Sequence, residues 1–372
     1  MISVIGLGNI GSIIAQELAN YYEVVALDSD RSRVERIAGI RGLVGQLDDV
    51  AGIIRESDLV VVALPGQVAF PYVKRILEWG INVIDISYSP ENPYNLESIA
   101  RSSGATYVPD CGFAPGLSNM LAYRLFKKSA ADDIEIIVGG LPERPVEPFL
   151  HSVTWSVEGL IDEYTRKASI ISDYKLKCVN PLDEIGSVNL PGYGDFEYFT
   201  SDGLRTLLTT MKVRNLSEKT IRFRGHLDRM RFLDEMGYFS EEMIDGVSPR
   251  KISERIFGKY RSEDKIDGVS PRKISERIFG KYRSADKDIC ILLVRTGDGS
   301  KHSMLTANGN GKETAMSMLT GIPAVAVSRL LLDGRIDGSG VIPPELIAED
   351  DHNFSTILEH LTKSGATFDS NL

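Results

Sequence analysis

The feature that most constrains the fold is the stretch "ISVIGLGNIG" at residues 2–11. A short apolar run leads into the pattern Gly-x-Gly-x-x-Gly, and an apolar-periodic segment then continues to residue 18. This order of strand, glycine-rich turn and helix is typical of the first unit of a dinucleotide-binding sheet. The pattern predicts that pyrophosphate binds at the helix N-terminus, against Gly6, Gly8, Asn9, Ile10 and Gly11.

The next apolar run, 24–27, ends at Asp28. Asp28 follows the glycine-rich turn by about 20 residues, the spacing at which an acid accepts the ribose hydroxyls of the coenzyme. A carboxylate repels a 2′-phosphate, so the sequence favours NAD over NADP. Arg31 and Arg33 follow closely, and their charge leaves NADP as the alternative. Asp28 as a solvated residue at a strand end is the other interpretation.

Apolar strands and helices then alternate. We expect strands at 58–65, 81–87 and 105–109 and helices at 47–55, 68–79 and 96–102. This rhythm predicts an α/β fold, a doubly wound parallel Rossmann sheet, whose ligands lie beyond the carboxyl ends of the strands. Three loops follow such ends, at 64–66, 87–89 and 110–112. We expect them to converge, with Leu64 and Pro65 binding coenzyme and Tyr88, Asp110 and Cys111 at the reacting centre.

The second half of the chain has a different pattern. After a helix at 118–127, strands are expected at 133–142, 169–179, 196–201, 219–225 and 288–297, with a helix at 226–236. This pattern predicts an α+β domain with a largely antiparallel sheet. A helix at 314–332, kinked or broken by Pro323, is expected to return to the first domain. The predicted domains are 1–116, 117–311 and 312–372.

A 22-residue segment occurs twice in direct succession, at 244–265 and 266–287, and the copies differ only at Glu263 and Ala285. Two copies are too few for a solenoid, which needs about three. We expect one copy to be a surface insertion without a chemical role. A lengthened contact between subunits is the alternative. The near-identity of the two copies indicates a recent or an engineered duplication.

Composition excludes several classes of protein. The net charge of −10 and the absence of a long basic run argue against nucleic acid as a partner. Five scattered histidines and three cysteines give neither a metal motif nor a disulfide framework. The first strand leaves no room for a leader, and no apolar run suggests a membrane span. We therefore expect a cytoplasmic protein with no membrane partner and no bound metal.

Seven stretches, "DCGFAPGLSN", "GGLPERP", "TWSVEGLIDEY", "FTSDGLRTL", "KTIRFRGH", "GVSPR" and "TAMSMLTGIPA", resemble the saccharopine dehydrogenase-like oxidoreductases. Within that family they are most similar to lysine 6-dehydrogenase. The resemblance implies a Rossmann domain, an inserted catalytic α+β domain and C-terminal helices. It also implies NAD-linked oxidation of the ε-amine of lysine to a semialdehyde, which cyclises, with release of ammonia. The tandem repeat departs from the family pattern.

Residues in the first half suit the nicotinamide side of such a reaction. Asp110 and Cys111 lie where the sheet leads into the next domain, and we expect the helix from Leu117 to offer amides to a ligand. Tyr88 can donate to the substrate or orient it. The alternatives are that Asp110 caps a turn, that Cys111 is a small buried apolar residue and that Tyr88 only packs.

The second half offers substrate-binding groups. Strand alternation puts Arg222 on one face with Thr220 and Arg224, so Arg222 is the first choice for gripping a carboxylate. His226 is a candidate base, or a structural cap. Thr200, Asp202 and Arg205 are further candidates for binding substrate. A surface ion pair for Arg222 and a helix cap for Asp202 are the alternatives.

Two other functions stay open at this point. A saccharopine-type reductase would couple an amino acid to a semialdehyde, and a non-catalytic sensor would only bind the dinucleotide. We expect a homo-oligomer, with a dimer through the second domain as the simplest form.

Overall fold

The computed structural model describes residues 1–153, 157–244, 246, 248–258, 288–311 and 313–372. The chain forms two compact units. The first unit contains residues 1–128, 205–207 and 317–368, and the second contains 129–204, 208–316 and 369–372. The returning C-terminal segment therefore belongs to the first unit, as the sequence predicts.

The first unit is built on a parallel sheet with the order β15-β6-β5-β4-β1-β2-β3. Its strands are β1 (Ile2–Ile5), β2 (Val24–Asp28), β3 (Arg41–Val44), β4 (Leu59–Val62), β5 (Asn82–Asp85), β6 (Thr106–Val108) and β15 (Gly340–Val341). The central strands β1 and β4 are buried along their whole length, as strands covered on both faces must be. The predicted doubly wound sheet is confirmed.

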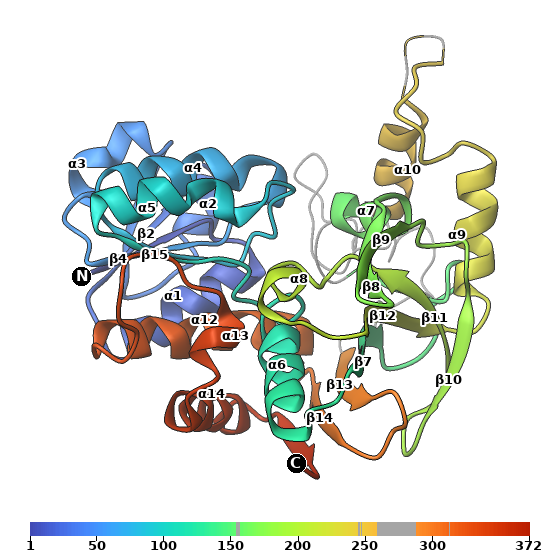
Figure 1. The fold of residues 1–372 in the computed structure, drawn as a ribbon. Coiled ribbons are helices and arrows are strands. Elements are labelled where there is room, and N and C mark those ends of the chain that lie inside the picture. The colour runs from blue at the N-terminus through green and yellow to red at the C-terminus, as the bar shows by residue number, and fades with distance from the viewer. Residues whose placement is uncertain (154–156, 245, 247, 259–287, 312) are drawn as a thin grey trace. The chain divides into compact units, whose positions relative to one another are not determined.

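Helices cover both faces of this sheet (Figure 1). They are α1 (Asn9–Ala19), α2 (Arg31–Val34), α3 (Ala51–Ile54), α4 (Gly66–Glu78), α5 (Glu97–Ser103), α6 (Leu117–Ser129), α12 (Ala315–Leu332), α13 (Pro344–Ile347) and α14 (Asp351–Lys363), with short 3-10 turns η1 (Asp48–Val50) and η2 (Pro93–Leu96). Apolar residues of α3, α4 and α5 pack on one face. On the other face α12 approaches α1 closely, since a side chain at Gly321 would contact Ile13 and Ile14.

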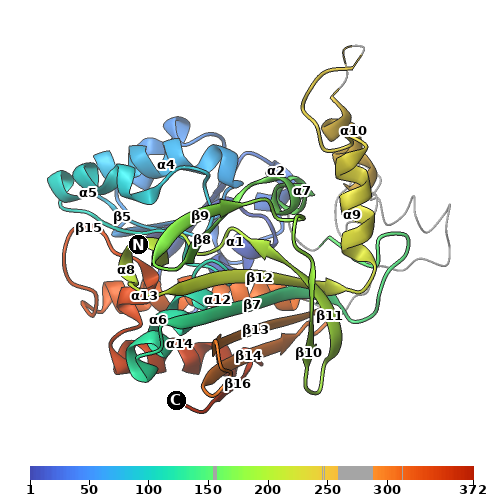
Figure 2. The ribbon, with the colours of Figure 1, turned by 45° about the vertical axis from the view of Figure 1, so that its right-hand side comes forward.

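The second unit is built on a mixed sheet with the order β10-β11-β12-β7-β13-β14-β16, joined by the hairpin of β8 and β9. Its strands are β7 (Asp133–Pro142), β8 (Ala168–Ser172), β9 (Lys175–Val179), β10 (Gly186–Leu190), β11 (Gly194–Ser201), β12 (Asn215–Phe223), β13 (Asp288–Thr296), β14 (His302–Asn308) and β16 (Thr367–Ser370). Figure 2 shows β12, β7, β13 and β14 side by side. These pairs are antiparallel except β12 with β7, which is parallel.

In the described residues, the helices that accompany this sheet are α7 (Val157–Thr165), α8 (Leu207–Thr210), α9 (His226–Glu235) and α10 (Pro249–Gly258). Residues of α7, α9 and α10 form an apolar core with Phe199 of β11. A second apolar core consists of strand residues only, among them Ile137, Ile221 and Ile291. Along β12 one face carries the buried polar residues Glu218, Thr220 and Arg222, and the other contributes Ile221 to the second core.

Three expectations need correction, and a fourth falls outside the described residues. The first unit extends to Lys128 rather than 116, and α6 is buried from Leu117 to Leu125. Pro323 does not break α12, which is continuous from Ala315 to Leu332. This helix has the length and hydropathy of a membrane span, contrary to the sequence-based expectation, but 78% of it is buried inside the protein. The second repeat copy, 266–287, lies outside the described residues.

Candidate active site

The glycine-rich turn has the geometry of a phosphate cradle. Gly6 has a φ of +94°, and a Cβ there would lie 2.4 Å from the carbonyl oxygen of Ala63. At Gly11 a Cβ would lie 1.8 Å from the oxygen of Gly6, so this glycine is required for packing of α1. At Gly8, in contrast, a Cβ would meet no atom within 4 Å. The open side of the turn therefore lies at Gly8, where the backbone can be approached.

Helix α1 presents uncapped amides at this open side. Gly8 is its N-cap and makes no side-chain capping bond, and the first turn, which begins with Asn9 and Ile10, carries no acidic residue. The first-turn N–H groups of a helix and its positive end attract anions. The residues present therefore fit the pyrophosphate of a dinucleotide. Leu64 and Pro65 follow β4, and a methyl group of Leu64 would lie 3.1 Å from a Cβ at Gly6, so the predicted coenzyme residues lie together.

Asp28 is buried and is already engaged by the backbone. Its Oδ2 accepts from the amide of Leu7 at 2.7 Å, and its Oδ1 accepts from Asp30 at 2.8 Å. The carboxylate therefore holds the glycine-rich turn, and each oxygen retains one lone pair for a ribose hydroxyl. Arg33 Nη1 lies 3.6 Å from Oδ2 with its side chain 41% exposed. Its positive charge offsets the repulsion of a 2′-phosphate by Asp28.

The three strand-end loops lie next to one another, as predicted. The strands β4, β5 and β6 are neighbours in the sheet. The backbone of Gly66 packs against the carbonyl oxygen of Tyr88, since a Cβ on Gly66 would lie 2.5 Å from it. The amide of Cys111 donates to the carbonyl of Asp85 at 2.8 Å.

The loop 110–116 closes on itself rather than opening toward a ligand. Amides of Leu117 and Ser118 donate to the carbonyls of Gly112 and Phe113, and the Ala114–Pro115 bond is cis. A Cβ at Gly116 would lie 2.3 Å from the oxygen of Gly112. The expectation that the start of α6 offers amides to a ligand is therefore wrong, because this loop uses its glycines to pack its own backbone.

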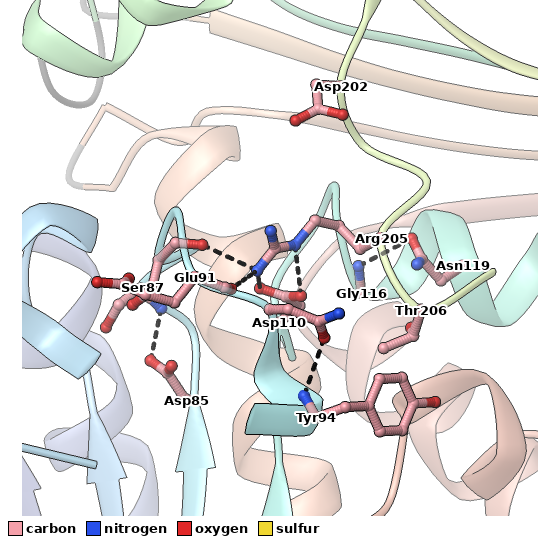
Figure 3. A network of polar contacts seen from close by, with 12 residues as sticks. Asp85, Ser87, Glu91, Tyr94, Asp110, Gly116, Asn119, Asp202, Arg205 and Thr206 are labelled. Atoms are coloured by element: carbon pink, nitrogen blue, oxygen red, sulfur yellow. Dashed lines mark hydrogen bonds and ion pairs between the residues drawn. The ribbon is translucent and has the colours of Figure 1, made fainter. Parts of the chain in front are cut away.

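Asp110 and Arg205 meet beyond the carboxyl ends of the strands (Figure 3), and the ring of Tyr88 contacts Arg205 at the same place. Arg205 Nε donates to Asp110 Oδ2 at 2.8 Å, and Arg205 Nη2 donates to the carbonyl of Ser89 at 2.9 Å. The guanidinium also lies 5.0 Å from the centre of the Tyr88 ring. Arg205 thus binds two strand-end loops together, and Tyr88 stays partly exposed.

These three residues share a strained backbone. Tyr88, Asp110 and Arg205 have φ values of +53°, +51° and +50°. They are the non-glycine residues of positive φ in the described part of the first unit. Left-handed conformations are unfavourable for such residues and gather at functional sites, where the surroundings enforce them. Their convergence marks this cluster as the candidate active site.

Beneath the cluster lie Asp85, Tyr107 and Cys111, all buried. Burial raises the pKa of the Cys111 thiol well above its usual range, and Asp110 and Asp85 add to the effect. Cys111 therefore stays a neutral thiol, and the structure gives it the packing role of a small buried residue. Asp85 was missed by the sequence analysis, although an acid within an otherwise apolar strand is a signal that could have found it.

Arg222 lies in the interior of the second unit, with 1% of its surface exposed. It pairs with Glu163 of α7, and its Nε donates to the Tyr164 hydroxyl at 3.1 Å. Alternation along β12 predicted its face, where Glu218 and Thr220 are also buried. The sequence left a surface ion pair open as the alternative for Arg222. This alternative is wrong, because the Arg222 side chain that pairs with Glu163 is only 1% exposed. A substrate carboxylate at Arg222 would compete with Glu163.

His226 is buried, with both ring nitrogens occupied. Nδ1 donates to the carbonyl of Phe149 at 2.6 Å, so the neutral ring accepts at Nε2 from the Tyr164 hydroxyl at 2.8 Å. Burial and then Arg222 lower the pKa of His226 to about 3. This geometry is that of a structural residue and does not support the predicted base.

Thr200 and Asp202 do not form one binding site with Arg222. Thr200 pairs with Lys219 across β11 and β12, on the face opposite to Arg222. Asp202 accepts from the amide of Ser169 at 3.1 Å and lies 3.4 Å from Arg166. It therefore secures the start of β8 and caps no helix, since α8 begins only at Leu207. In the described residues no group of histidine, cysteine and acidic side chains could hold a metal.

Comparison with known proteins identifies the relatives of this chain. The saccharopine dehydrogenase C-terminal domain model matches residues 112–366. The chain belongs to the saccharopine dehydrogenase family. A TrkA-N domain model matches residues 2–65, which contain the glycine-rich turn. This family is one of oxidoreductases, so the resemblance noted from the sequence motifs is confirmed at the level of the family.

Individual relatives are distant. The mitochondrial alpha-aminoadipic semialdehyde synthase of Rattus norvegicus is 24% identical over 65% of this chain and 27% of its own length. A saccharopine dehydrogenase [NADP(+), L-glutamate-forming] of Pyricularia oryzae is 22% identical over 51% and 45%. The chain thus spans less than half the length of these relatives. The fold matches apo saccharopine dehydrogenase (L-Glu forming) of Saccharomyces cerevisiae with a TM-score of 0.74, at 16% identity and over 100% and 99% of the two chains.

Proposed function

We propose that this member of the saccharopine dehydrogenase family is an NAD-dependent amino-acid dehydrogenase that oxidises the ε-amine of lysine. Loss of hydride from the carbon that bears the amine gives an imine; water adds to it, which releases ammonia and leaves a semialdehyde that cyclises. The observation that carries the proposal is the convergence of Tyr88, Asp110 and Arg205 in strained conformations at the ends of β5 and β6. In sheets of this type the reacting part of a ligand lies at these ends.

The first unit supplies the coenzyme site. Uncapped amides of α1 and the open backbone at Gly8 bind the pyrophosphate, and Asp28 accepts from a ribose hydroxyl. When bound, NAD supplies the acceptor for the hydride that leaves the carbon bearing the amine. NADP is the alternative, because Arg33 lies beside Asp28 and a relative is named for NADP. Calorimetric titration with both dinucleotides, on the wild type and on Arg33→Ala, decides between them.

Tyr88 is the group proposed to contact the substrate. Its phenol is partly exposed and is held against the guanidinium of Arg205. Asp110 is engaged by that same guanidinium through both carboxylate oxygens, so it orients Arg205 rather than meeting the amine. Arg205 is therefore a positioning residue, and its earlier assignment to substrate binding is replaced by this role.

A saccharopine-type reductase is the second candidate, favoured by the names of the relatives. It would use a reduced dinucleotide to join an amino acid to a semialdehyde. A dinucleotide-dependent sensor without turnover is the third.

The deciding experiment follows NADH formation with lysine, ornithine and other amines, and NADPH consumption with semialdehyde plus glutamate. NADH formation with lysine, without NADPH consumption in the second assay, supports the proposal. Consumption only in the second assay favours the reductase, and binding of dinucleotide without turnover in either assay favours the sensor.

We further propose a cytoplasmic location and a homodimer. Light scattering on the purified protein measures the oligomeric state, and a monomer over the assay range of concentration would contradict the dimer.

A further inference from the structure

Asp85 ends β5 directly below the candidate active site. Its side chain is buried, with 1% of the residue exposed. A carboxyl group at such a position is costly unless its oxygens are hydrogen-bonded. The partners of Asp85 therefore show what the group does.

The carboxyl group joins two neighbouring segments. Its Oδ1 accepts from the amide of Ser87 at 2.8 Å, and its Oδ2 accepts from the hydroxyl of Tyr107 on β6 at 3.2 Å. The carbonyl of the same residue accepts from the amide of Cys111 at 2.8 Å. One residue thus fixes the start of the loop that carries Tyr88 and the start of the loop that carries Asp110.

The bond to Ser87 has a direct consequence for Tyr88. A side chain that accepts from the amide two residues ahead turns the backbone sharply. Tyr88 follows that turn and takes the left-handed conformation. On its other side, the carbonyl of Ser89 is held by Arg205. Tyr88 is therefore held between two tethers, one at Asp85 and one at Arg205.

We infer that Asp85 is a positioning residue: its carboxyl group, held between the Ser87 amide and the Tyr107 hydroxyl, fixes the loop that presents Tyr88 without touching substrate. The effect of Asp85 on turnover rests on the proposed function, whereas its effect on the order of the two loops does not.

The charges around Asp85 make this tether sensitive to pH. The groups that face it are Asp110, Tyr107, Cys111 and, through Asp110, Arg205. Burial raises the pKa of Asp85 to about 6, and Asp110 adds to the effect, while the bonds from Ser87 and Tyr107 oppose it. Above about pH 6 the ionised carboxylate accepts both bonds. Below it the proton must be placed toward one partner, and the tether weakens.

Four variants test the inference. Asp85→Ala removes the carboxyl group, and Asp85→Asn keeps an acceptor for the Ser87 amide but cannot ionise. Tyr107→Phe removes one hydrogen-bond donor to Asp85, and Asp48→Asn is the control at an exposed acid. Hydrogen exchange followed by mass spectrometry reports on peptides that cover 82–92 and 107–117. In Asp85→Ala we expect exchange in both peptides to rise about tenfold, with a peptide over 351–363 unchanged. Tyr107→Phe should show a smaller rise and serves if Asp85→Ala does not fold.

Kinetics complete the test. Asp85→Ala should lower kcat about tenfold or more through misplacement of Tyr88, with the affinity for NAD within about twofold of the wild type. Asp85→Asn resembles the protonated acid, so it should show at every pH the lowered kcat that the wild type reaches only below about pH 6. Unchanged exchange in both peptides overturns the inference, whatever the activity. Absence of turnover in the wild type overturns the proposed function only, since the exchange result then stands alone.

Discussion

Arg205 and Asp110 form an ion pair in which both residues have a left-handed backbone. Arg205 Nε lies 2.8 Å from Asp110 Oδ2, and the side chains are 11% and 2% exposed. Residues 205–207 belong to the first unit, although their neighbours on both sides in the chain belong to the second. The pair therefore anchors a short segment of the chain to the strand-end loops of the sheet.

A double-mutant cycle on Asp110→Asn and Arg205→Gln measures this anchor. Asparagine tolerates the left-handed conformation, so the change removes charge without new strain. Each single variant should lose about 3 kcal/mol in urea unfolding, because it leaves a buried charge unpaired, and the double variant should lose less than the sum. The exposed pair Lys363 and Glu359 is the matched control, and its coupling should stay below about 0.5 kcal/mol. Equal coupling in the two cycles would contradict the anchor.

Two alanine substitutions in one turn separate coenzyme binding from folding. Gly8→Ala places a methyl group in open space, whereas Gly11→Ala drives one into the oxygen of Gly6. Gly8→Ala should keep the melting temperature and weaken NAD binding about tenfold or more in calorimetry. Gly11→Ala should lose about 1–3 kcal/mol of folding free energy. If Gly8→Ala binds NAD as the wild type does, the coenzyme does not lie over this turn.

Glu218 predicts a pH dependence of stability. Burial raises its pKa to about 8, with Asp202 and Glu163 adding to the effect and Ser201 opposing it. The folded state holds the proton more tightly than the unfolded chain, whose glutamates titrate near pH 4.3. This contribution is therefore full at low pH and is lost as the pH rises toward and through about 8.

Melting temperatures of the wild type and of Glu218→Gln, measured from about pH 5 to about pH 9, test this sign. The wild type should lose stability with rising pH more steeply than the variant, which has no proton to lose. Glu242→Gln, at an exposed position, should follow the wild type. Parallel curves for all three proteins would show that Glu218 is not buried as described.

Arg222→Ala should lower the free energy of unfolding, whatever its effect on the binding of lysine. Loss of the guanidinium leaves Glu163 and the Tyr164 hydroxyl without their partner. We expect a loss of about 3 kcal/mol or more in urea unfolding. Arg224→Ala, two residues along and 65% exposed, is the control and should change stability by less than about 0.5 kcal/mol. If Arg222→Ala has the stability of the wild type and a raised KM for lysine, then Arg222 binds the substrate carboxylate, as the sequence suggested.

Deletion of either repeat copy should leave the enzyme intact. Removal of 244–265 or of 266–287 gives chains that differ at a single residue. The first copy supplies α10, in which Phe257 stacks on Phe149 with ring centres 4.5 Å apart and Arg250 pairs with Asp162. Each deletion retains one set of these residues, so melting temperature and kcat should match the full chain. A loss of activity or a change in oligomeric state in both deletions would favour the lengthened subunit contact.

The sequence predicted the first unit well because its rules are local. The order of strand, glycine turn and helix at residues 2–18, and the apolar run before Asp85, each specify an element without reference to distant residues. The same holds for the face of β12 on which Arg222 lies, since alternation along a strand requires no partner. The strands β3, β10, β14, β15 and β16 were missed, because their residues show neither a continuous apolar run nor regular apolar alternation.

The candidate site was predicted only in part, because its decisive contacts join distant segments. Tyr88, Asp110 and Arg205 were each proposed, but Arg205 lies 95 residues from Asp110 along the chain, and it had been assigned to the substrate. His226 has the residue type of a base, and only the structure shows that Phe149 and Tyr164 occupy both its nitrogens. Its burial likewise follows from packing that no local pattern reports.

The most direct test of the central claim uses lysine carrying deuterium on the carbon that bears the ε-amine. The enzyme is incubated with this substrate and NAD, and mass spectrometry then measures deuterium in the reduced coenzyme. The account predicts that one deuterium appears in the reduced coenzyme, together with ammonia and the cyclised product. Reduced coenzyme without deuterium, or no reduced coenzyme although NAD binds, would contradict it.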